Sequence, residues 1–221
     1  MAKTTKPEVS VADKVTGKVT GFYNLHKKTL FIACAAVVVI LLVIVIVSAV
    51  MTSNTEKAMI RISDLGDRVT AYVSAGESNQ EEFDALVSEL NAEIGKSSYP
   101  SIKAAFLLGN LYFDTEDYQN AYTSYVKCYE LNTSSYLAPL ALVNGAAAAE
   151  ELGDTDSALE LYSKVQDYEI SGVNAKALFN SARINLGKGN TELAKAQLES
   201  IVASYAYSEY AALAKNILNV M

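Results

Sequence analysis

The stretch of sequence that decides the fold is residues 105–128, AFLLGNLYFDTEDYQNAYTSYVKC. Its small and large residues stand at fixed intervals: Ala105, Leu108, Gly109 and Tyr112, then Ala121, Tyr125 and Cys128. Two further copies follow: Leu142, Gly145, Ala146 and Ala149 with Ala158, Tyr162 and Val165, then Leu178, Ser181, Ala182 and Asn185 with Ala194, Leu198 and Ile201. The copies are spaced by 37 and then 36 residues, which indicates an internal repeat.

Each copy has the pattern of two helices joined by a short turn. Apolar residues recur at steps of three or four on both sides of the turn, as they do on one face of a helix. Glycine ends a helix and Asp or Asn begins the next in two of the three turns, which are Thr115–Asp117, Gly153–Thr155 and Gly189–Thr191. Small residues such as Gly109 allow paired helices to approach closely, and large ones such as Tyr125 fill the space between consecutive pairs. The sequence therefore predicts an all-α chain of antiparallel helical hairpins.

This pattern resembles the tetratricopeptide repeat. It departs from the family pattern by lacking the early Trp, by carrying Ala149 where a Tyr is usual, and by longer turns after Leu131 and Asp167. The resemblance implies a tetratricopeptide-like α-solenoid of three repeats over residues 99–206, with a curvature that these departures leave open. The alternative is an array of helical hairpins without true repeat geometry.

A further helical pair is expected before the repeats. Apolar residues recur at steps of three or four over about residues 56–75, and Gly76 suits the end of this helix. Ser78–Glu81 has the pattern of a capping box before a second apolar stripe that runs to about Gly95. We interpret residues 53–98 as a degenerate first helical pair.

One more helix is expected after the third repeat. Residues 209–220, EYAALAKNILNV, have an apolar stripe and no partner helix after them. Because the last hairpin of a solenoid has an exposed face that must be covered, we expect residues 207–221 to form a C-terminal capping helix.

Residues 30–51, LFIACAAVVVILLVIVIVSAVM, contain no charged residue, Pro or Gly. At about 1.5 Å per residue such a helix spans roughly 33 Å, which is enough to cross a hydrocarbon core about 30 Å thick. We interpret residues 29–52 as an uncleaved transmembrane helix. A buried core helix rarely needs so long an uncharged run, and the apolar part of a signal peptide has only about 7–15 residues. Cys34 lies too close to Lys28 for a lipoprotein signal.

The charged flanks predict the orientation of this helix. Residues 1–28 form a basic leader, in which six lysines against Glu8 and Asp13 give a net charge of +4. Residues 1 to about 15 are expected to be disordered, and residues 16–28 suit the membrane interface. Because Lys and Arg accumulate on the cytoplasmic side, we predict a single-pass protein of the inner (cell) membrane with a cytoplasmic N-terminus and a periplasmic, or otherwise exoplasmic, C-terminal domain.

The remainder of the chain lacks the residues that common catalytic sites need. Twelve cations against 23 acids give it a net charge of −11, which argues against binding to nucleic acid. His26, the one histidine, lies in the leader, so a Ser-His-Asp arrangement or a His-ligated zinc site is excluded from the C-terminal domain. Cys128 lies in a packing position, and acids cluster only at turns, where they stabilise helix N-termini: Glu116–Asp117, Glu150–Glu151 and Asp154–Asp156. We therefore expect no enzyme activity, no metal and no cofactor.

The resemblance also implies a partner-binding surface. In tetratricopeptide arrays the first helix of each pair lines a concave groove. The corresponding residues here are Lys103, Phe106, Asn110 and Phe113, then Leu140, Val143, Ala147 and Glu150, then Lys176, Phe179, Arg183 and Leu186. A groove that mixes apolar and polar side chains suits an extended segment or a helix of another protein. The alternative is that Phe106 and Phe179 belong to the core.

The order of the segments resembles one bacterial family. The leader ends in Phe22–Lys28, FYNLHKK, and one span, two helices and three degenerate repeats follow. This layout is similar to the single-span tetratricopeptide proteins typified by the ancillary subunit of the Sec translocon, whose relatives include the repeat domain of a cell division coordinator. The resemblance implies a membrane-anchored scaffold or chaperone-like adaptor that binds proteins near the translocation machinery. The alternative is a scaffold for cell-envelope assembly or division with the same fold.

Overall fold

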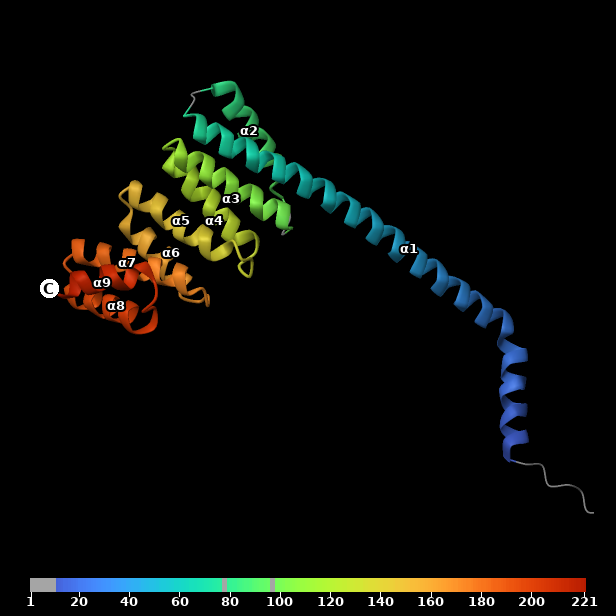
Figure 1. Cartoon of the computed structure of the whole chain (residues 1–221). Coiled ribbons are helices and arrows are strands. Elements are labelled where there is room, and N and C mark those ends of the chain that lie inside the picture. Colours follow the sequence, from blue (N-terminus) through green and yellow to red (C-terminus); the bar gives the residue numbers. More distant parts are fainter. Residues whose placement is uncertain (1–10, 77–78, 96–97) are drawn as a thin grey trace, which may run out of the picture. The chain divides into compact units, whose positions relative to one another are not determined.

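A computed structural model of the chain describes residues 11–76, 79–95 and 98–221, and these residues form α-helices and no strands. The helices are α1 (Val11–Ala75), α2 (Gln80–Glu93), α3 (Tyr99–Asp114), α4 (Tyr118–Leu131), α5 (Ala138–Glu151), α6 (Thr155–Val165), α7 (Ser171–Gly187), α8 (Thr191–Ser204) and α9 (Glu209–Leu218). The predicted all-α class and repeat arrangement are confirmed (Figure 1). The chain divides into two compact units, Met1–Thr55 and Glu56–Met221.

In the first unit, the described residues belong to the N-terminal part of α1. By length and composition this helix could cross a membrane, because Phe31–Ala75 contains a window with a mean hydropathy of 3.4 that is not buried inside the protein. A signal sequence near the N-terminus meets the same criteria. Val11–Val15 are helical where the sequence predicted disorder, because no Pro or Gly interrupts the chain there and helix propagation is cooperative. The rest of that prediction, for residues 1–10, lies outside the described residues.

The second unit begins with the C-terminal part of α1, which packs against α2 and α3. One cluster holds the apolar side chains of the first two helices: Ile62, Leu65 and Val69 of α1 with Leu86 and Leu90 of α2. Helix α2 begins after Asn79, whose side chain accepts a hydrogen bond from the backbone N–H of Glu82 at 3.3 Å. The residue expected to open the capping box, Ser78, lies outside the described residues.

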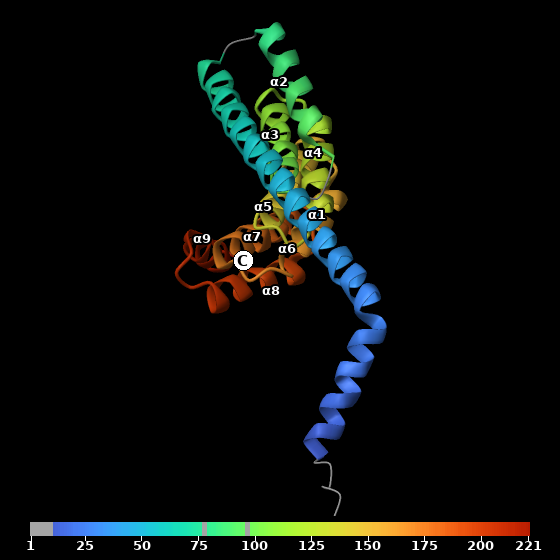
Figure 2. The ribbon, with the colours of Figure 1, turned by 90° about the vertical axis from the view of Figure 1, so that its right-hand side faces the viewer.

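Three helical hairpins follow, α3–α4, α5–α6 and α7–α8, and both views show them in this order along the second unit (Figures 1 and 2). Each hairpin turns at a residue with positive φ, namely Glu116 at 62°, Gly153 at 77° and Gly189 at 78°. The next residue caps the second helix. The carboxylates of Asp117 and Asp154 accept hydrogen bonds from the backbone N–H three residues later, at 3.2 and 3.0 Å.

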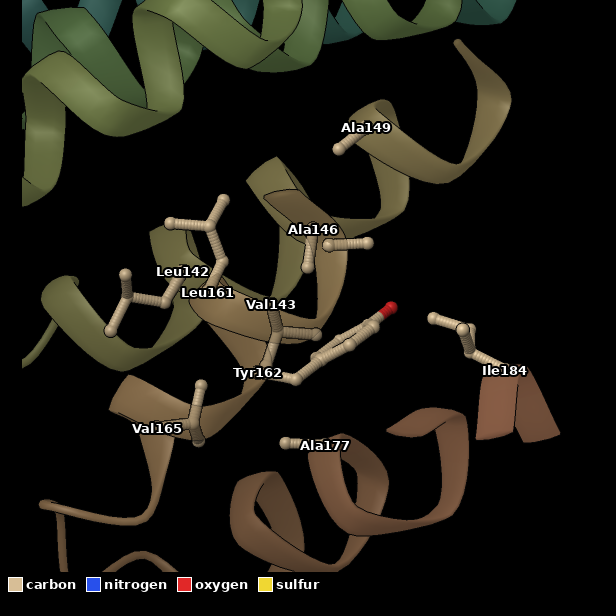
Figure 3. Close-up of a cluster of buried hydrophobic side chains, with 10 residues drawn as sticks. Leu142, Val143, Ala146, Ala149, Leu161, Tyr162, Val165, Ala177 and Ile184 are labelled. Carbon is tan, nitrogen blue, oxygen red and sulfur yellow. The ribbon is translucent and has the colours of Figure 1, made fainter. Parts of the chain in front are cut away.

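The paired helices approach closely at small residues. Gly109 of α3 faces the ring of Tyr125 of α4, and a Cβ atom at Gly109 would lie 2.6 Å from that ring. Tyr125 also reaches the next hairpin, where its Cβ lies 3.3 Å from the place of a Cβ on Gly145. Tyr162 of α6 takes the equivalent place one repeat later, buried among residues of α5 and α7 (Figure 3): Leu142, Val143, Ala146, Ala177 and Ile184. A tyrosine thus joins each of these hairpins to the following one.

Helix α9 covers the last hairpin. Its Ala211 and Ala214 are buried in one cluster with Leu198 and Ile201 of α8. The small side chains of α9 allow it to lie close to α8, so the apolar face of the third repeat is removed from solvent. Helix α9 also extends the series of first helices, α3, α5 and α7, by one member.

Candidate partner-binding groove

Two adjoining cavities follow the first helices of the repeats. One, of about 270 Å³, is lined by residues of α3, α4, α5 and α7: Asn110, Phe113, Asp114, Tyr125, Asn144, Ala147 and Lys176. The other, of about 470 Å³, is lined by α5, α7, α9 and the residue before α9: Leu140, Val143, Asn144, Gly172, Val173, Lys176, Ser208, Glu209 and Tyr210. Asn144 and Lys176 line both cavities, so the two adjoin at these side chains. We call them together the α3–α9 groove.

The two halves of the α3–α9 groove differ in chemistry. The larger cavity is mainly apolar, with walls formed by Leu140, Val143, Val173 and Tyr210. The smaller cavity carries amide, carboxylate and ammonium groups from Asn110, Asn144, Asp114 and Lys176. Partial burial raises the pKa of the Asp114 carboxyl above its usual range. The groove can therefore accept an apolar side chain at one end and polar groups at the other.

The floor of the polar half is held by Tyr125. Its hydroxyl donates a hydrogen bond to Oδ1 of Asn110 at 2.8 Å, and the side chain of Asn144 also bonds to this hydroxyl. Burial raises the pKa of Tyr125 above its usual value, so the hydroxyl stays protonated as a donor. Because Asn110, Tyr125 and Asn144 come from α3, α4 and α5, this hydroxyl links side chains of three helices.

The next repeat contains a related network. The hydroxyl of Tyr162 donates to Oε1 of Glu150 at 2.8 Å and accepts from Nδ2 of Asn180 at 3.1 Å. Glu150 also forms an ion pair with Arg183. Asn144 and Asn180 are 36 residues apart, so each bonds the tyrosine of the preceding hairpin from the equivalent position of its own helix. This network occupies the polar groups of Glu150 and Arg183 within the protein.

The residues expected from the sequence to form a groove divide into two groups. Six of them line the α3–α9 groove: Asn110, Phe113, Leu140, Val143, Ala147 and Lys176. Val143 is only 3% exposed and belongs to the buried cluster of α5, α6 and α7. Lys176 and Leu140 are exposed, so these two side chains are open to a ligand.

The other expected residues lie outside the two cavities. The ring of Phe106 packs edge-on against Tyr125 at 5.8 Å between ring centroids, and Nζ of Lys103 lies 5.6 Å from the centroid of Phe106. Phe179 packs against Tyr210, with 5.5 Å between the ring centroids. Leu186 is half-buried against the cluster of α8 and α9. Phe106 and Phe179 thus pack against the groove residues Tyr125 and Tyr210.

Sequence reasoning missed several residues that line the groove: Asp114, Tyr125, Asn144, Gly172, Val173, Ser208, Glu209 and Tyr210. Those at positions 208–210 were missed because the last helix was interpreted only as a cap. Asn144 carried a signal that was available, since it is a polar residue within an apolar helix and Asn180 follows it 36 residues later. A search for polar residues in repeat register would have identified both.

Within the part of the chain that the structure describes, no three side chains of His, Cys, Asp or Glu converge as a metal ion would require. Cys128 is fully buried, and burial raises the pKa of its thiol to about 12. A protonated, inaccessible thiol is a poor nucleophile. Cys128 therefore acts in packing, within the cluster that also contains Tyr125.

Comparisons with known proteins agree with this architecture. Residues 102–135 and residues 176–206 each match a family model described as tetratricopeptide repeat. A TPR repeat-containing protein of Treponema pallidum (strain Nichols) is 26% identical over 147 residues, which make up 64% of this chain. The chain spans 60% of the length of that relative. The repeats thus indicate a protein–protein interaction module, a class whose members typically act as scaffolds without catalysis.

Proposed function

We propose that this protein is a membrane-anchored interaction module that binds a segment of another protein in the α3–α9 groove. The observation that carries the proposal is that two adjoining cavities extend across α3, α5, α7 and α9, because a surface shared by four helices can hold an elongated ligand. The protein contributes binding and position and performs no chemistry of its own.

The chemistry of the groove defines the ligand. An apolar side chain of the partner enters the cavity beside Leu140, Val173 and Tyr210. Polar groups of the same partner segment reach Lys176 and Asp114 in the smaller cavity. An extended segment or one face of a helix supplies this combination, and the fixed Tyr125 network keeps the polar half in its binding shape.

The membrane anchor is the apolar part of α1. Its helix is long and apolar enough to span a bilayer, and the basic leader before it favours a cytoplasmic N-terminus. The second unit then lies in the periplasm or another exoplasmic space. Protease added to intact cells with an opened outer envelope should degrade the second unit and spare the leader, whereas protection of the second unit would contradict this orientation.

We further propose that the partner belongs to the protein translocation machinery, where a chaperone-like adaptor would meet emerging chains. This step rests on the resemblance of the segment order to the ancillary translocon subunit. A scaffold for envelope assembly or division would have the same fold, and it differs in the partner recovered and in its location at septa.

A photo-crosslinking amino acid placed at Leu140 tests the groove in the native membrane. Leu140 is exposed and lines the apolar cavity, so we expect a discrete crosslinked partner that mass spectrometry identifies. The double variant Leu140→Gln with Lys176→Glu should lose partner binding in pull-downs from solubilised membranes. The matched control is Leu152→Gln with Lys195→Glu, which changes two exposed residues outside the groove and should bind normally. Equal binding by both variants would exclude the groove as the binding site.

A further inference from the structure

Two opposite edges of the second unit differ in chemistry. The alternating helices define them: Arg61 of α1 pairs with Glu93 at the end of α2, and Phe83 at the start of α2 packs against Tyr112 near the end of α3. Helix α2 is thus antiparallel to both neighbours. The entry edge is the one where the chain enters the unit at Glu56 and where α3, α5, α7 and α9 begin. The turn edge is the one where α2, α4, α6 and α8 begin.

The entry edge presents large apolar side chains in places where polar residues are usual. The loops that lead into α5, α7 and α9 each contain one such exposed residue, namely Tyr136, Ile170 and Tyr207. Tyr207 has no burial at all, and Ile60, four residues into the unit, is 70% exposed. Loops in contact with water normally carry small and polar residues, so the recurrence of a large exposed side chain at the same place in three successive loops is notable. Of the three, Tyr136 also stacks on Tyr99, and their hydroxyl oxygens lie 2.7 Å apart.

The turn edge is acidic, and helix capping does not account for the difference. The turn of the first hairpin carries Asp114, Glu116 and Asp117, and that of the second carries Glu150, Glu151, Asp154 and Asp156. The third turn carries Lys188 beside Glu192. Lys188 forms an ion pair with Asp156, and Arg183 forms one with Glu150. Acids stabilise any helix N-terminus. Yet α3, α5 and α7, which begin at the entry edge, have no acid in the first turn, whereas α2, α6 and α8, which begin at the turn edge, do. There are two exceptions: α4 begins at the turn edge and has no acid in its first turn, and α9 begins at the entry edge with Glu209.

The charges of the entry edge are mixed. Glu130, Asp167, Glu169 and Glu209 lie there, interspersed with lysines of the same edge: Lys57, Lys103, Lys164 and Lys176. The turn edge also carries apolar side chains: the exposed Leu152, Leu193, Val220 and Met221, and the half-buried ring pair of Phe113 and Tyr118. Acids of the first two turns stand beside Phe113, Tyr118 and Leu152. Exposed tyrosines and mixed charge suit the headgroup layer of a bilayer, and a dense acidic edge is repelled by anionic lipids.

We infer that the entry edge rests on the lipid interface of the membrane that anchors the chain, with Ile60, Tyr136, Ile170 and Tyr207 in contact with the headgroup layer. This inference rests on the proposed membrane anchoring. We favour lipid over a second protein as the partner of the entry edge, because the chain connects this edge directly to the predicted span. Glu56, at the entry edge, follows the span (29–52) by four residues. The contact keeps the entry edge at the bilayer surface and the turn edge away from it.

The test uses the full chain with Cys34→Ala, reconstituted into vesicles of phosphatidylcholine and phosphatidylglycerol. Cys128 remains, because it is buried and does not react with label in the folded protein. An environment-sensitive fluorophore is attached to Ile170→Cys or Tyr207→Cys at the entry edge. The matched controls are Leu152→Cys and Leu193→Cys at the turn edge, which are also exposed.

Nitroxide-labelled lipids should quench the two entry-edge labels several-fold more than the two control labels, and the emission of the entry-edge labels should shift to the blue. Equal quenching at all four positions overturns the inference. A blue shift without quenching by lipid also overturns it, since a protein then covers the edge. Flotation of the vesicles tests the anchor separately. Protein that does not float with the vesicles contradicts both the membrane anchor and the lipid contact of the entry edge. Protein that floats but shows no quenching at the entry edge contradicts only the lipid contact.

Discussion

Replacement of Glu116 by glycine should stabilise the second unit. Glu116 has a φ of 62° and is, within residues 11–76, 79–95 and 98–221, the one non-glycine residue with positive φ. The equivalent residues of the next two repeats, 37 and then 36 positions later, are Gly153 and Gly189. The first hairpin thus makes with a glutamate the same turn that the other two make with glycine.

The expected gain follows from two opposing terms. A residue with a Cβ atom in the left-handed region costs about 1–2 kcal/mol, and glycine removes this cost. Glycine also increases the conformational entropy of the unfolded chain, which lowers the free energy of unfolding by about 0.4–1 kcal/mol. Because Glu116 is exposed, loss of its side chain forfeits little packing. The net stabilisation is about 0.5–1 kcal/mol, which corresponds to a rise of roughly 1–4 °C in melting temperature for a unit of this size.

Tyrosine fluorescence of the full-length protein in detergent measures this change during urea unfolding. The chain has 14 tyrosines and no tryptophan, and only Tyr23 precedes the second unit, so the signal reports on the repeats. Two variants serve as controls. Glu116→Ala removes the carboxylate and keeps the strained φ, so its stability should stay near that of the parent. Gly153→Ala adds a Cβ with no atom within 4 Å, so its loss of about 1 kcal/mol isolates the backbone cost.

The comparison of Glu116→Gly with Glu116→Ala decides the matter. If the glycine variant is no more stable than the alanine variant, the turn is relaxed with glutamate and the reasoning from φ is wrong. A loss of stability in Gly153→Ala with no gain in Glu116→Gly would mean that the first turn differs from the second in solution.

Three further predictions concern packing, hydrogen bonding and pH. Gly109→Ala should destabilise the second unit by about 1–3 kcal/mol, because the new Cβ would lie 2.6 Å from the ring of Tyr125. Gly66→Ala, whose Cβ would have its nearest neighbour at 3.6 Å, should be tolerated in the same urea assay. Equal effects of the two variants would contradict close packing at Gly109. Tyr162→Phe should cost about 1–3 kcal/mol, since Glu150 loses a donor at 2.8 Å, and a neutral result in urea unfolding would show that the network contributes no net stability. Burial raises the pKa of Cys128 to about 12 and also raises that of Tyr125. A group whose pKa is raised on folding stabilises the folded state fully below its unfolded pKa, and this stabilisation is lost as the pH rises towards the folded pKa. The stability of the second unit should therefore fall as the pH rises from about 9 towards 12, which circular dichroism and tyrosinate absorbance can follow together. An unchanged stability over this range would show that these groups are not buried.

Much of the fold could be predicted because it depends on local chemistry. The pattern of small and large residues, repeated after 37 and then 36 residues, predicted the three hairpins. Gly153 and Gly189 marked two turns at which the chain has positive φ. The apolar run from residue 30 to 51 identified a helix long enough to cross a membrane, which the structure places within α1. Each of these features depends on residues close to one another in the chain, so periodicity and turn chemistry suffice to find it.

The composition of the groove depends on tertiary packing. On a helix, neighbouring positions point about 100° apart, so a small rotation of one hairpin against the next exchanges a groove residue for a core residue. This rotation placed Phe106 against Tyr125 and paired Glu150 with Arg183, while it brought Asn144 into the groove.

The sequence by itself determined the hairpins, their turns and the apolar helix, because the free energy that selects them comes from single residues and their near neighbours. The tertiary structure decided which side chains are available to a partner. It made Tyr210 of the last helix part of the groove, and it buried Val143 to 3% exposure although both residues line the same cavity. Exposure is set by contacts between helices far apart in the chain, and no local pattern records those contacts.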